Sequence, residues 1–282
     1  MKKILGIVAG EGSLPFIVAQ NARRNSVTKI CGIGFKGQTN PAFEECADEF
    51  LWIGLGQLGR LIKFFKKNDV SEAVFIGRIC HNIVFTDLKL DFKMLQVATK
   101  IRDWRADSIL SAIAGAIEAE NITILPSTQY LQELLPVPGV LTKHQISRQQ
   151  KDDISFGFFV AKHLAAIDAG QTVVVKKKTV LALEAIEGTD AAILRGGMLG
   201  KKDSVVVKVS KPNQDMRFDV PVIGLTTIRK LKEANVSLLA FEANKTLLVD
   251  REDVIKEAEK NNIAIVSVNP DTLDLSDFLR SI

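Results

Sequence analysis

The chain has 282 residues, of which 46% are hydrophobic and 25% are charged, and its formal net charge is +4. These values exclude a disordered chain and are typical of a globular protein with room for two domains. The positive charge is small and dispersed, so the sequence does not predict a nucleic-acid-binding surface. It suits phosphate ligands or weak docking to an anionic membrane.

The cysteines and the apolar runs exclude further classes of protein. The cysteines are Cys31, Cys46 and Cys80, and no CxxC pair occurs among them. We therefore expect neither a disulfide framework nor a zinc cluster, in keeping with a reducing cytoplasm. The first apolar run, residues 4–9, is too short for a signal peptide and predicts a buried strand. No apolar run is long enough to span a membrane, so we expect at most peripheral membrane contact.

Residues 1–130 alternate short apolar runs with longer amphipathic stretches. The pattern predicts strands at 4–8, 29–34, 49–53, 72–76 and 122–125, separated by helices at 14–24, 56–68, 95–100 and 107–120. Strands separated by helices indicate βαβ units, so we predict a Rossmann-like domain with a parallel sheet. Ligands of such sheets bind beyond the carboxyl ends of the strands.

The rest of the chain has a different order of elements. Residues 131–145 contain Pro136, Pro138 and Gly139 and are expected to form a linker. Residues 146–282 begin with a long helix, predicted at 147–169, and continue with mixed strands and helices. The predicted fold class is therefore α/β, with an N-terminal Rossmann-like parallel-sheet domain and a C-terminal α+β catalytic domain.

The loop after the first strand is the first candidate binding site. It runs Gly10-Glu11-Gly12-Ser13-Leu14-Pro15, between a predicted strand and a predicted helix. Its glycines allow close backbone approach, and free N–H groups at a helix start favour a phosphate. A dinucleotide fingerprint fits less well, because Pro15 stands where the third glycine belongs and no acidic residue ends the second strand. A tight turn without a ligand is the alternative.

Gly77 and Arg78 end another strand of the same predicted sheet. An arginine in that place can bind a diphosphate through two parallel N–H groups. A surface arginine paired with a nearby acidic residue is the alternative.

Charged residues gather in two segments of the C-terminal half. The first segment contains Glu184, Glu187, Gly188, Thr189 and Asp190, and the second contains Lys208, Lys211, Asp215, Arg217 and Asp219. Cations can neutralise a diphosphate, while carboxylates can hold a divalent metal ion or orient a water molecule. A solvated loop has the same composition. However, Asp219 directly precedes an apolar strand, where a carboxylate usually has a partner.

Three segments together resemble the LpxI family of UDP-2,3-diacylglucosamine pyrophosphatases. They are Ile7 to Pro15, Leu181 to Asp190 and Asp215 to Gly224, in this order along the chain. The resemblance implies a Mg²⁺-dependent hydrolase of lipid A and lipopolysaccharide biosynthesis. Its substrate, UDP-2,3-diacylglucosamine, would be split into UMP and 2,3-diacylglucosamine 1-phosphate (lipid X) by water that attacks the phosphorus on the sugar side. The resemblance also implies a cytoplasmic homodimer with exchanged domains, associated peripherally with the inner membrane.

The resemblance assigns roles to individual residues. The expected substrate-binding residues are Gly10, Glu11, Gly12, Ser13, Gly77, Arg78, Glu187, Gly188 and Thr189. Composition adds Lys208 and Lys211, whose ammonium groups can neutralise the diphosphate. The resemblance makes Asp219 the catalytic carboxylate, flanked by Asp215 and Arg217, and places Asp190 beside the metal. The expected Mg²⁺ ligands are therefore Asp219 and Asp190.

Two other functions remain open from the sequence. One is a nicotinamide-dependent oxidoreductase, which the missing ribose-binding acid and Pro15 disfavour. The other is a nucleotide-sugar-binding protein without turnover, which would have little need for paired carboxylates near a diphosphate.

Overall fold

The computed structural model describes residues 3–79, 90–99, 101, 106–212 and 214–273, so Cys80 lies outside the described residues. The chain divides into two compact units. The N-terminal unit comprises Met1–Gln132 together with Asp215–Asp219, and the C-terminal unit comprises Glu133–Gln214 and Val220–Ile282. Among the described residues, no helix has the length and apolar character needed to cross a membrane.

Strands and helices alternate through the N-terminal unit, as the apolar periodicity predicts. Its strands are β1 (Ile4–Ala9), β2 (Lys29–Phe35), β3 (Glu49–Ile53), β4 (Glu72–Ile76) and β5 (Thr123–Ile124). Its helices are α1 (Leu14–Arg24), α2 (Leu58–Lys67), α3 (Phe92–Ala98) and α4 (Ala106–Glu118), with the 3₁₀ helices η1 (Pro41–Cys46) and η3 (Ser127–Tyr130).

The five strands of this unit form one parallel sheet in the order β3-β2-β1-β4-β5. The chain builds outward from β1 to β3 and then crosses to β4 on the other side of β1. The connection therefore reverses direction between β1 and β4, where Ala9 at the end of β1 is paired with Ile76 at the end of β4. In open parallel sheets, the crevice at this switch point is the preferred place for a ligand.

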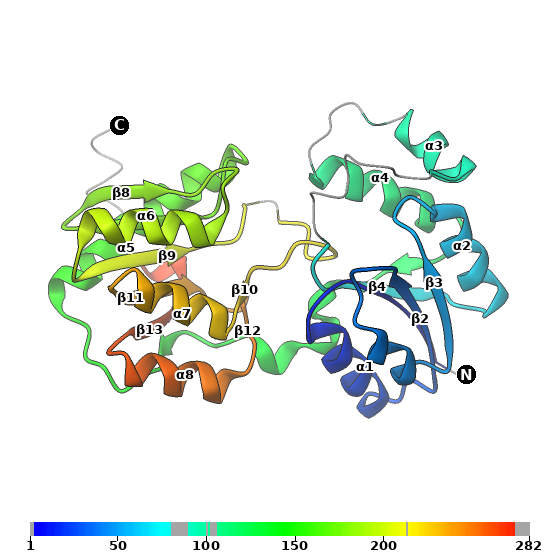
Figure 1. Ribbon diagram of the computed structural model, residues 1–282, viewed down its shortest axis with the longest axis horizontal. Helices are drawn as coiled ribbons and strands as arrows, with labels where there is room; N and C mark the ends of the chain where they lie inside the picture. Colours follow the sequence, from blue (N-terminus) through cyan, green and yellow to red (C-terminus); the bar gives the residue numbers. More distant parts are fainter. Residues whose placement is uncertain (1–2, 80–89, 100, 102–105, 213, 274–282) are drawn as a thin grey trace. The chain divides into compact units, whose positions relative to one another are not determined.

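Helices α2 and α4 cover one face of this sheet (Figure 1). Their apolar side chains, including Phe65 of α2, form a buried cluster with Val8 of β1 and Ile33 of β2. A Cβ atom on Gly6 would lie 2.7 Å from the Phe65 ring, so β1 needs a glycine where α2 packs against it. The packed helices hold the carboxyl ends of β1 and β4 in a fixed register.

The C-terminal unit is built around a six-stranded sheet with the order β6-β13-β11-β9-β7-β8. Its strands are β6 (Gly139–Val140), β7 (Thr172–Lys176), β8 (Thr179–Leu183), β9 (Ser204–Lys208), β11 (Val236–Glu242) and β13 (Ala264–Val268). The helices are α5 (Arg148–Ala166), α6 (Thr189–Gly200), α7 (Leu225–Glu233) and α8 (Arg251–Lys260). Shorter elements are β10 (Val222–Ile223), β12 (Leu247–Leu248), η4 (Gln132–Leu134) and η5 (Pro270–Thr272).

This second sheet is mixed, which confirms the predicted fold class. Strands β9, β11 and β13 run parallel, whereas β6 and the β7–β8 hairpin join antiparallel. Helix α5 packs on one face and helices α6, α7 and α8 on the other (Figure 1), each face with its own buried apolar cluster. The expected linker contributes β6, so part of it belongs to the sheet.

The segment Asp215–Asp219 is the main departure from the domain division that the sequence suggests. We expected it within a C-terminal domain of residues 146–282, but the structure packs it into the N-terminal unit. The chain leaves the C-terminal sheet after β9, forms this turn on the N-terminal unit, and returns before β10. Packing of Phe218 into the core beside Phe75 of β4 explains the excursion, because the ring is removed from water there.

Candidate functional site

The loop after β1 and the loop after β4 are joined at the switch point of the N-terminal sheet. The Gly10 N–H donates to the Ile76 carbonyl at 2.8 Å, which extends the ladder by one residue beyond β1. Glu11 and Arg78 then form an antiparallel bridge, with N–H to O distances of 2.8 and 3.0 Å. The structure therefore brings together the two loops that the sequence predicts to bind the uridine diphosphate.

Glycines are required on both sides of this bridge for steric reasons. A Cβ atom on Gly10 would lie 2.6 Å from the Arg78 carbonyl oxygen, and one on Gly77 would lie 2.9 Å from the Glu11 carbonyl oxygen. Gly77 and Gly12 also have φ angles of 99° and 104°, a region that side chains disfavour. The Gly10 and Gly77 backbones thus approach each other more closely than residues with a Cβ atom allow.

Helix α1 begins directly after this loop, at Leu14. Ser13 is its N-cap residue, yet the Ser13 side chain makes no capping hydrogen bond, and Pro15 lacks an N–H group. First-turn N–H groups of a helix attract anions through their partial positive charge. Arg78 is exposed, and among the described residues no ion pair engages its guanidinium. This edge therefore combines backbone donors with one cationic side chain.

The Asp215–Asp219 turn docks on the same unit through Ser127, at the start of η3. Ser127 Oγ lies 2.6 Å from the Phe75 carbonyl oxygen and 2.7 Å from the Arg217 carbonyl oxygen. The Ser127 N–H donates to the Met216 carbonyl at 2.7 Å. The Phe218 and Phe75 rings meet edge to face with centroids 5.4 Å apart. Because Phe75 is the next-to-last residue of β4, these contacts place the turn at the carboxyl end of that strand.

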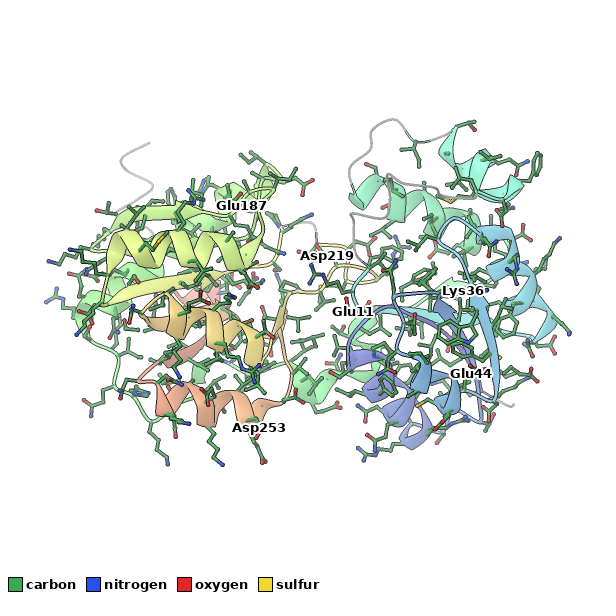
Figure 2. The ribbon with its side chains drawn as sticks, viewed as in Figure 1. Glu11, Lys36, Glu44, Glu187, Asp219 and Asp253 are labelled. Carbon is green, nitrogen blue, oxygen red and sulfur yellow. The ribbon has the colours of Figure 1, made fainter. Side chains whose placement is uncertain are left out.

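The turn itself is held by ion pairs. The Arg217 guanidinium donates to both Asp215 oxygens, the shortest contact being 2.8 Å, and to Glu118 of α4 at 2.9 Å. The Asp215 carboxylate also accepts the Arg217 backbone N–H at 3.0 Å. Hydrogen bonding from Arg217 holds the pKa of Asp215 below its ordinary value. Asp215 and Arg217 are thus bonded to each other, whereas half-buried Asp219 follows at the end of the turn. Figure 2 shows Asp219 and Glu11 as labelled side chains of this unit.

A second cluster forms in the C-terminal unit where β8, β9 and α6 meet. The Thr189 hydroxyl donates to Glu184 Oε1 at 2.7 Å, and the Lys208 ammonium donates to the Thr189 oxygen at 3.1 Å. Glu184 and Lys208 are only 8% and 9% exposed, so both charges are largely removed from water. A buried charge needs partners of this kind. The structure therefore brings Thr189 and Lys208 together, and Glu184 joins them through Thr189.

Other predicted residues of this unit have different surroundings. Gly188 has a φ of 83° and caps the start of α6, and Asp190 lies exposed in the first turn of that helix. Glu187 forms an ion pair with Arg195 of α6 at 2.7 Å. Lys211 forms one with Asp168 at 2.7 Å. Among the described residues, neither Glu187 nor Lys211 is hydrogen-bonded to Thr189.

The residues expected to bind Mg²⁺ belong to different units, Asp219 to the N-terminal unit and Asp190 to the C-terminal unit. Within the described ranges, no group of three or more His, Cys, Asp or Glu side chains gathers closely enough to hold a metal ion. Mg²⁺ commonly takes only one or two protein carboxylates and completes its shell with water and substrate phosphates. The donor chemistry of Asp219 and Asp190 fits such an ion.

Sequence reasoning missed Ser127, Glu118 and the part that Glu184 plays in the Thr189 cluster. The position of Ser127 just after the carboxyl end of β5, in a sheet of this type, is the signal that could have identified it.

These features define a class of protein: a two-unit α/β protein with two joined glycine loops at the switch point of a parallel sheet and an acidic turn docked on the same unit. Two family models then match the chain, the LpxI N-terminal domain over residues 4–134 and the LpxI C-terminal domain over residues 137–266. The chain therefore belongs to the LpxI family, which confirms the resemblance seen in the three sequence segments.

A relative from Caulobacter vibrioides, named UDP-2,3-diacylglucosamine pyrophosphatase LpxI, is 28% identical over an alignment that covers 94% of this chain and 98% of the relative. Solved structures resemble the chain only distantly. The biotin carboxylase subunit of pyruvate carboxylase has 13% identity over 62% of this chain and 35% of its own, with a TM-score of 0.27. The biotin carboxylase of Campylobacter jejuni has 10% identity over 70% and 42%, with a TM-score of 0.28. Likenesses this weak carry no argument about function.

Proposed function

We propose that this chain hydrolyses the diphosphate of UDP-2,3-diacylglucosamine, in lipid A biosynthesis, to UMP and 2,3-diacylglucosamine 1-phosphate. Membership of the LpxI family supports the substrate and the enzyme class. The structural observation that carries the proposal is the docking of the Asp219 turn on β4, in the same unit as the joined Gly10 and Gly77 loops.

In this proposal the loops at the carboxyl ends of β1 and β4 bind the diphosphate and neutralise its charge. N–H groups at the start of α1 and the Arg78 guanidinium stabilise the diphosphate, whose negative charge grows on the leaving UMP. Asp219 orients the attacking water and accepts its proton. A phosphoanhydride needs charge stabilisation and an in-line water more than a covalent nucleophile. Asp215 and Arg217 hold the turn that carries Asp219, because their charged groups are bonded to each other.

Metal dependence belongs to the same proposal. Asp219 and Asp190 would supply carboxylate oxygens to Mg²⁺, which would neutralise charge on the phosphate oxygens when bound. The Lys208 ammonium, held by Thr189, would neutralise the sugar phosphate. Incubation with UDP-2,3-diacylglucosamine and Mg²⁺, analysed by mass spectrometry, tests the reaction. We expect UMP that disappears on chelation and returns with added Mg²⁺; absence of UMP, or UMP formation that chelation does not change, would refute the claim.

The site of attack is tested in water enriched in heavy oxygen. Attack on the sugar-side phosphorus breaks the bond between that phosphorus and the bridging oxygen, so the label enters 2,3-diacylglucosamine 1-phosphate. Label in UMP would contradict this course.

The carboxylate is tested by Asp219→Ala. We expect a loss of roughly 10²–10⁴-fold in kcat, the usual cost of removing a general base, while bound substrate is still detected. Asp253→Ala, an exposed carboxylate of α8 labelled in Figure 2, is the matched control and should keep full activity. Retention of more than about a tenth of the activity by Asp219→Ala would reject its role.

We also propose a cytoplasmic homodimer that associates peripherally with the inner membrane, where its lipid substrate lies. Sedimentation equilibrium should give twice the chain mass, and flotation with anionic phospholipid vesicles should recover protein at low salt. A monomer at all concentrations, or no flotation, would refute the respective part.

A further inference from the structure

The C-terminal unit contains a polar cavity of about 370 Å³ at the carboxyl ends of β11 and β13. Its lining residues are Lys162, Glu242, Ala243, Asn244, Lys245, Asn269, Pro270 and Asp271. None of them belongs to the site described above. Strands β9, β11 and β13 run parallel, so this edge has the same relation to its sheet that ligand sites have in open parallel sheets.

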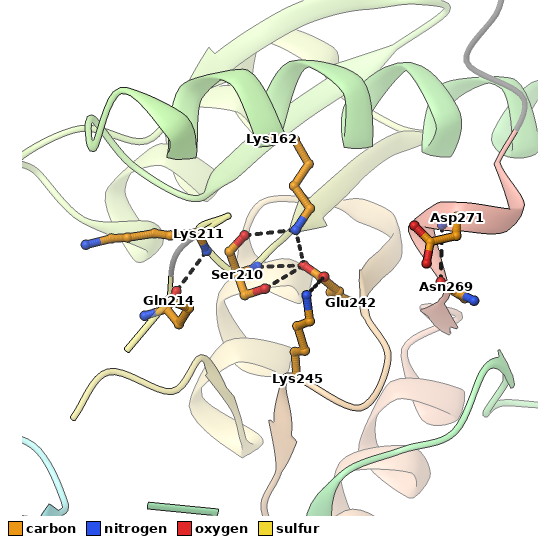
Figure 3. Close-up of polar contacts among 8 residues, drawn as sticks. All are labelled: Lys162, Ser210, Lys211, Gln214, Glu242, Lys245, Asn269 and Asp271. Atoms are coloured by element: carbon orange, nitrogen blue, oxygen red, sulfur yellow. Dashed lines mark hydrogen bonds and ion pairs between the residues drawn. The ribbon is translucent and has the colours of Figure 1, made fainter. Parts of the chain in front are cut away.

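Glu242, the last residue of β11, is the anchor of this cavity and is only 2% exposed. Its Oε2 accepts from Lys162 Nζ at 2.5 Å, from the Ser210 N–H at 3.0 Å and from Ser210 Oγ at 2.7 Å, while its Oε1 accepts from Lys245 Nζ at 2.9 Å (Figure 3). Burial raises the pKa of this carboxyl, but these hydrogen bonds outweigh burial and hold the pKa below its ordinary value. Both carboxylate oxygens are thus occupied by protein donors.

The two lysines retain donors for another molecule. An ammonium group has three N–H donors. Lys162 directs one to Glu242 and one to the Ser210 carbonyl at 3.0 Å, which leaves one, and Lys245 directs one to Glu242, which leaves two. Two ammonium groups around one carboxylate leave a net charge of +1 at this wall of the cavity. Such a wall favours an anion with several acceptor oxygens.

Polar groups of another kind lie across from this cluster. Figure 3 shows Asn269 and Asp271 opposite Glu242, with the Asn269 side-chain oxygen accepting the Asp271 N–H at 3.1 Å. A carboxylate and amide groups are suited to hydroxyl groups, and the Asp271 charge repels a second anion. The cavity volume lies within the range of small-molecule sites, roughly 300–1,000 Å³.

We propose that this cavity binds a phosphate monoester of a hydroxylated molecule, with the phosphate at Lys162 and Lys245 and the hydroxyl groups toward Asn269 and Asp271. The chemistry is shared by a sugar phosphate and by a nucleoside monophosphate. The proposal rests on the side chains of the C-terminal unit alone and does not depend on the proposed hydrolysis. Ser210, which contacts both Lys162 and Glu242, begins the segment that leads to Asp215, so an occupied cavity would stabilise the start of that segment.

Lysine labelling of the wild-type chain tests the site without a mutation. Lys245 is half exposed and reacts with acetic anhydride, as does exposed Lys256 of α8. We expect N-acetylglucosamine 1-phosphate or UMP to protect Lys245 but not Lys256, as measured by peptide mass spectrometry. The monoester that protects Lys245 at the lower concentration identifies the natural class. N-acetylglucosamine, which lacks the phosphate, should give no protection. Protection by neither monoester, or equal protection by N-acetylglucosamine, would overturn the proposal.

Binding calorimetry on a lysine variant is the second test of the site. Lys245→Met removes one ammonium group at the cavity, and Lys256→Met removes the same charge on α8. We expect Lys245→Met to weaken binding of the protecting monoester at least about tenfold, the loss typical of one hydrogen bond to a charged group, with Lys256→Met unchanged. Equal affinity in the two variants would place the monoester elsewhere and refute the assignment.

Discussion

Replacing Ser127 by alanine tests whether the Asp219 turn depends on its docking to β4. The Ser127 hydroxyl carries one proton, so it donates to either the Phe75 or the Arg217 carbonyl, 2.6 and 2.7 Å away. Its loss removes one hydrogen bond at Ser127, which is only 2% exposed, and leaves one of the two carbonyls without that donor. These two effects together cost about 1–3 kcal/mol. A displaced turn also moves Asp219, so we expect kcat to fall roughly ten- to a hundredfold, with little change in KM.

The stability part is measured by urea unfolding with tryptophan fluorescence. Both tryptophans, Trp52 and Trp104, precede residue 132, so the signal reports on the N-terminal unit. Ser71→Ala, an exposed serine of the same unit, is the matched control and should change neither stability nor kcat. If Ser127→Ala behaved like the control in both measurements, the docking argument would be wrong. An unchanged kcat with lower stability would show that the contacts hold the unit together without positioning Asp219.

Substitutions at Gly10, Glu184 and Asp215 give three further predictions. Gly10→Ala should weaken UMP binding and destabilise the N-terminal unit by more than about 2 kcal/mol, because its Cβ would lie 2.6 Å from a carbonyl oxygen. Gly115→Ala is the control, because its Cβ meets nothing within 4 Å. Equal effects of the two substitutions would refute the steric argument. Glu184→Ala removes the acceptor of the Thr189 hydroxyl and should raise KM with kcat less affected, whereas unchanged KM would exclude that cluster from binding. Because the folded-state pKa of Asp215 is lowered, its contribution to stability is present above about pH 4 and lost as pH falls through the folded pKa. Asp215→Asn should therefore be less stable than wild type at neutral pH and approach it in acid; a constant difference in urea midpoint across that range would contradict the ion pair.

Periodicity and turn chemistry were enough to predict the N-terminal sheet and its glycine loops. The apolar runs of β1 and β4 end at Gly10 and Gly77, and the carboxyl ends of parallel strands share one edge, so two loops distant in sequence could be assigned to one site. The roles proposed for Asp219 and Asp190 come from the family resemblance, because spacing alone does not suggest them.

Tertiary structure decided where the acidic turn and the buried charges lie. Asp215–Asp219 is polar and irregular, and no local pattern shows that Phe218 packs beside Phe75 or that Ser127 bonds to Arg217, 90 residues away in sequence. The pairing of Glu184, Thr189 and Lys208 likewise depends on β8, α6 and β9 meeting in space. Local sequence sets backbone propensity and the alternation of apolar residues. The partner of a polar side chain is chosen only when packing removes that side chain from water and leaves it one set of neighbours.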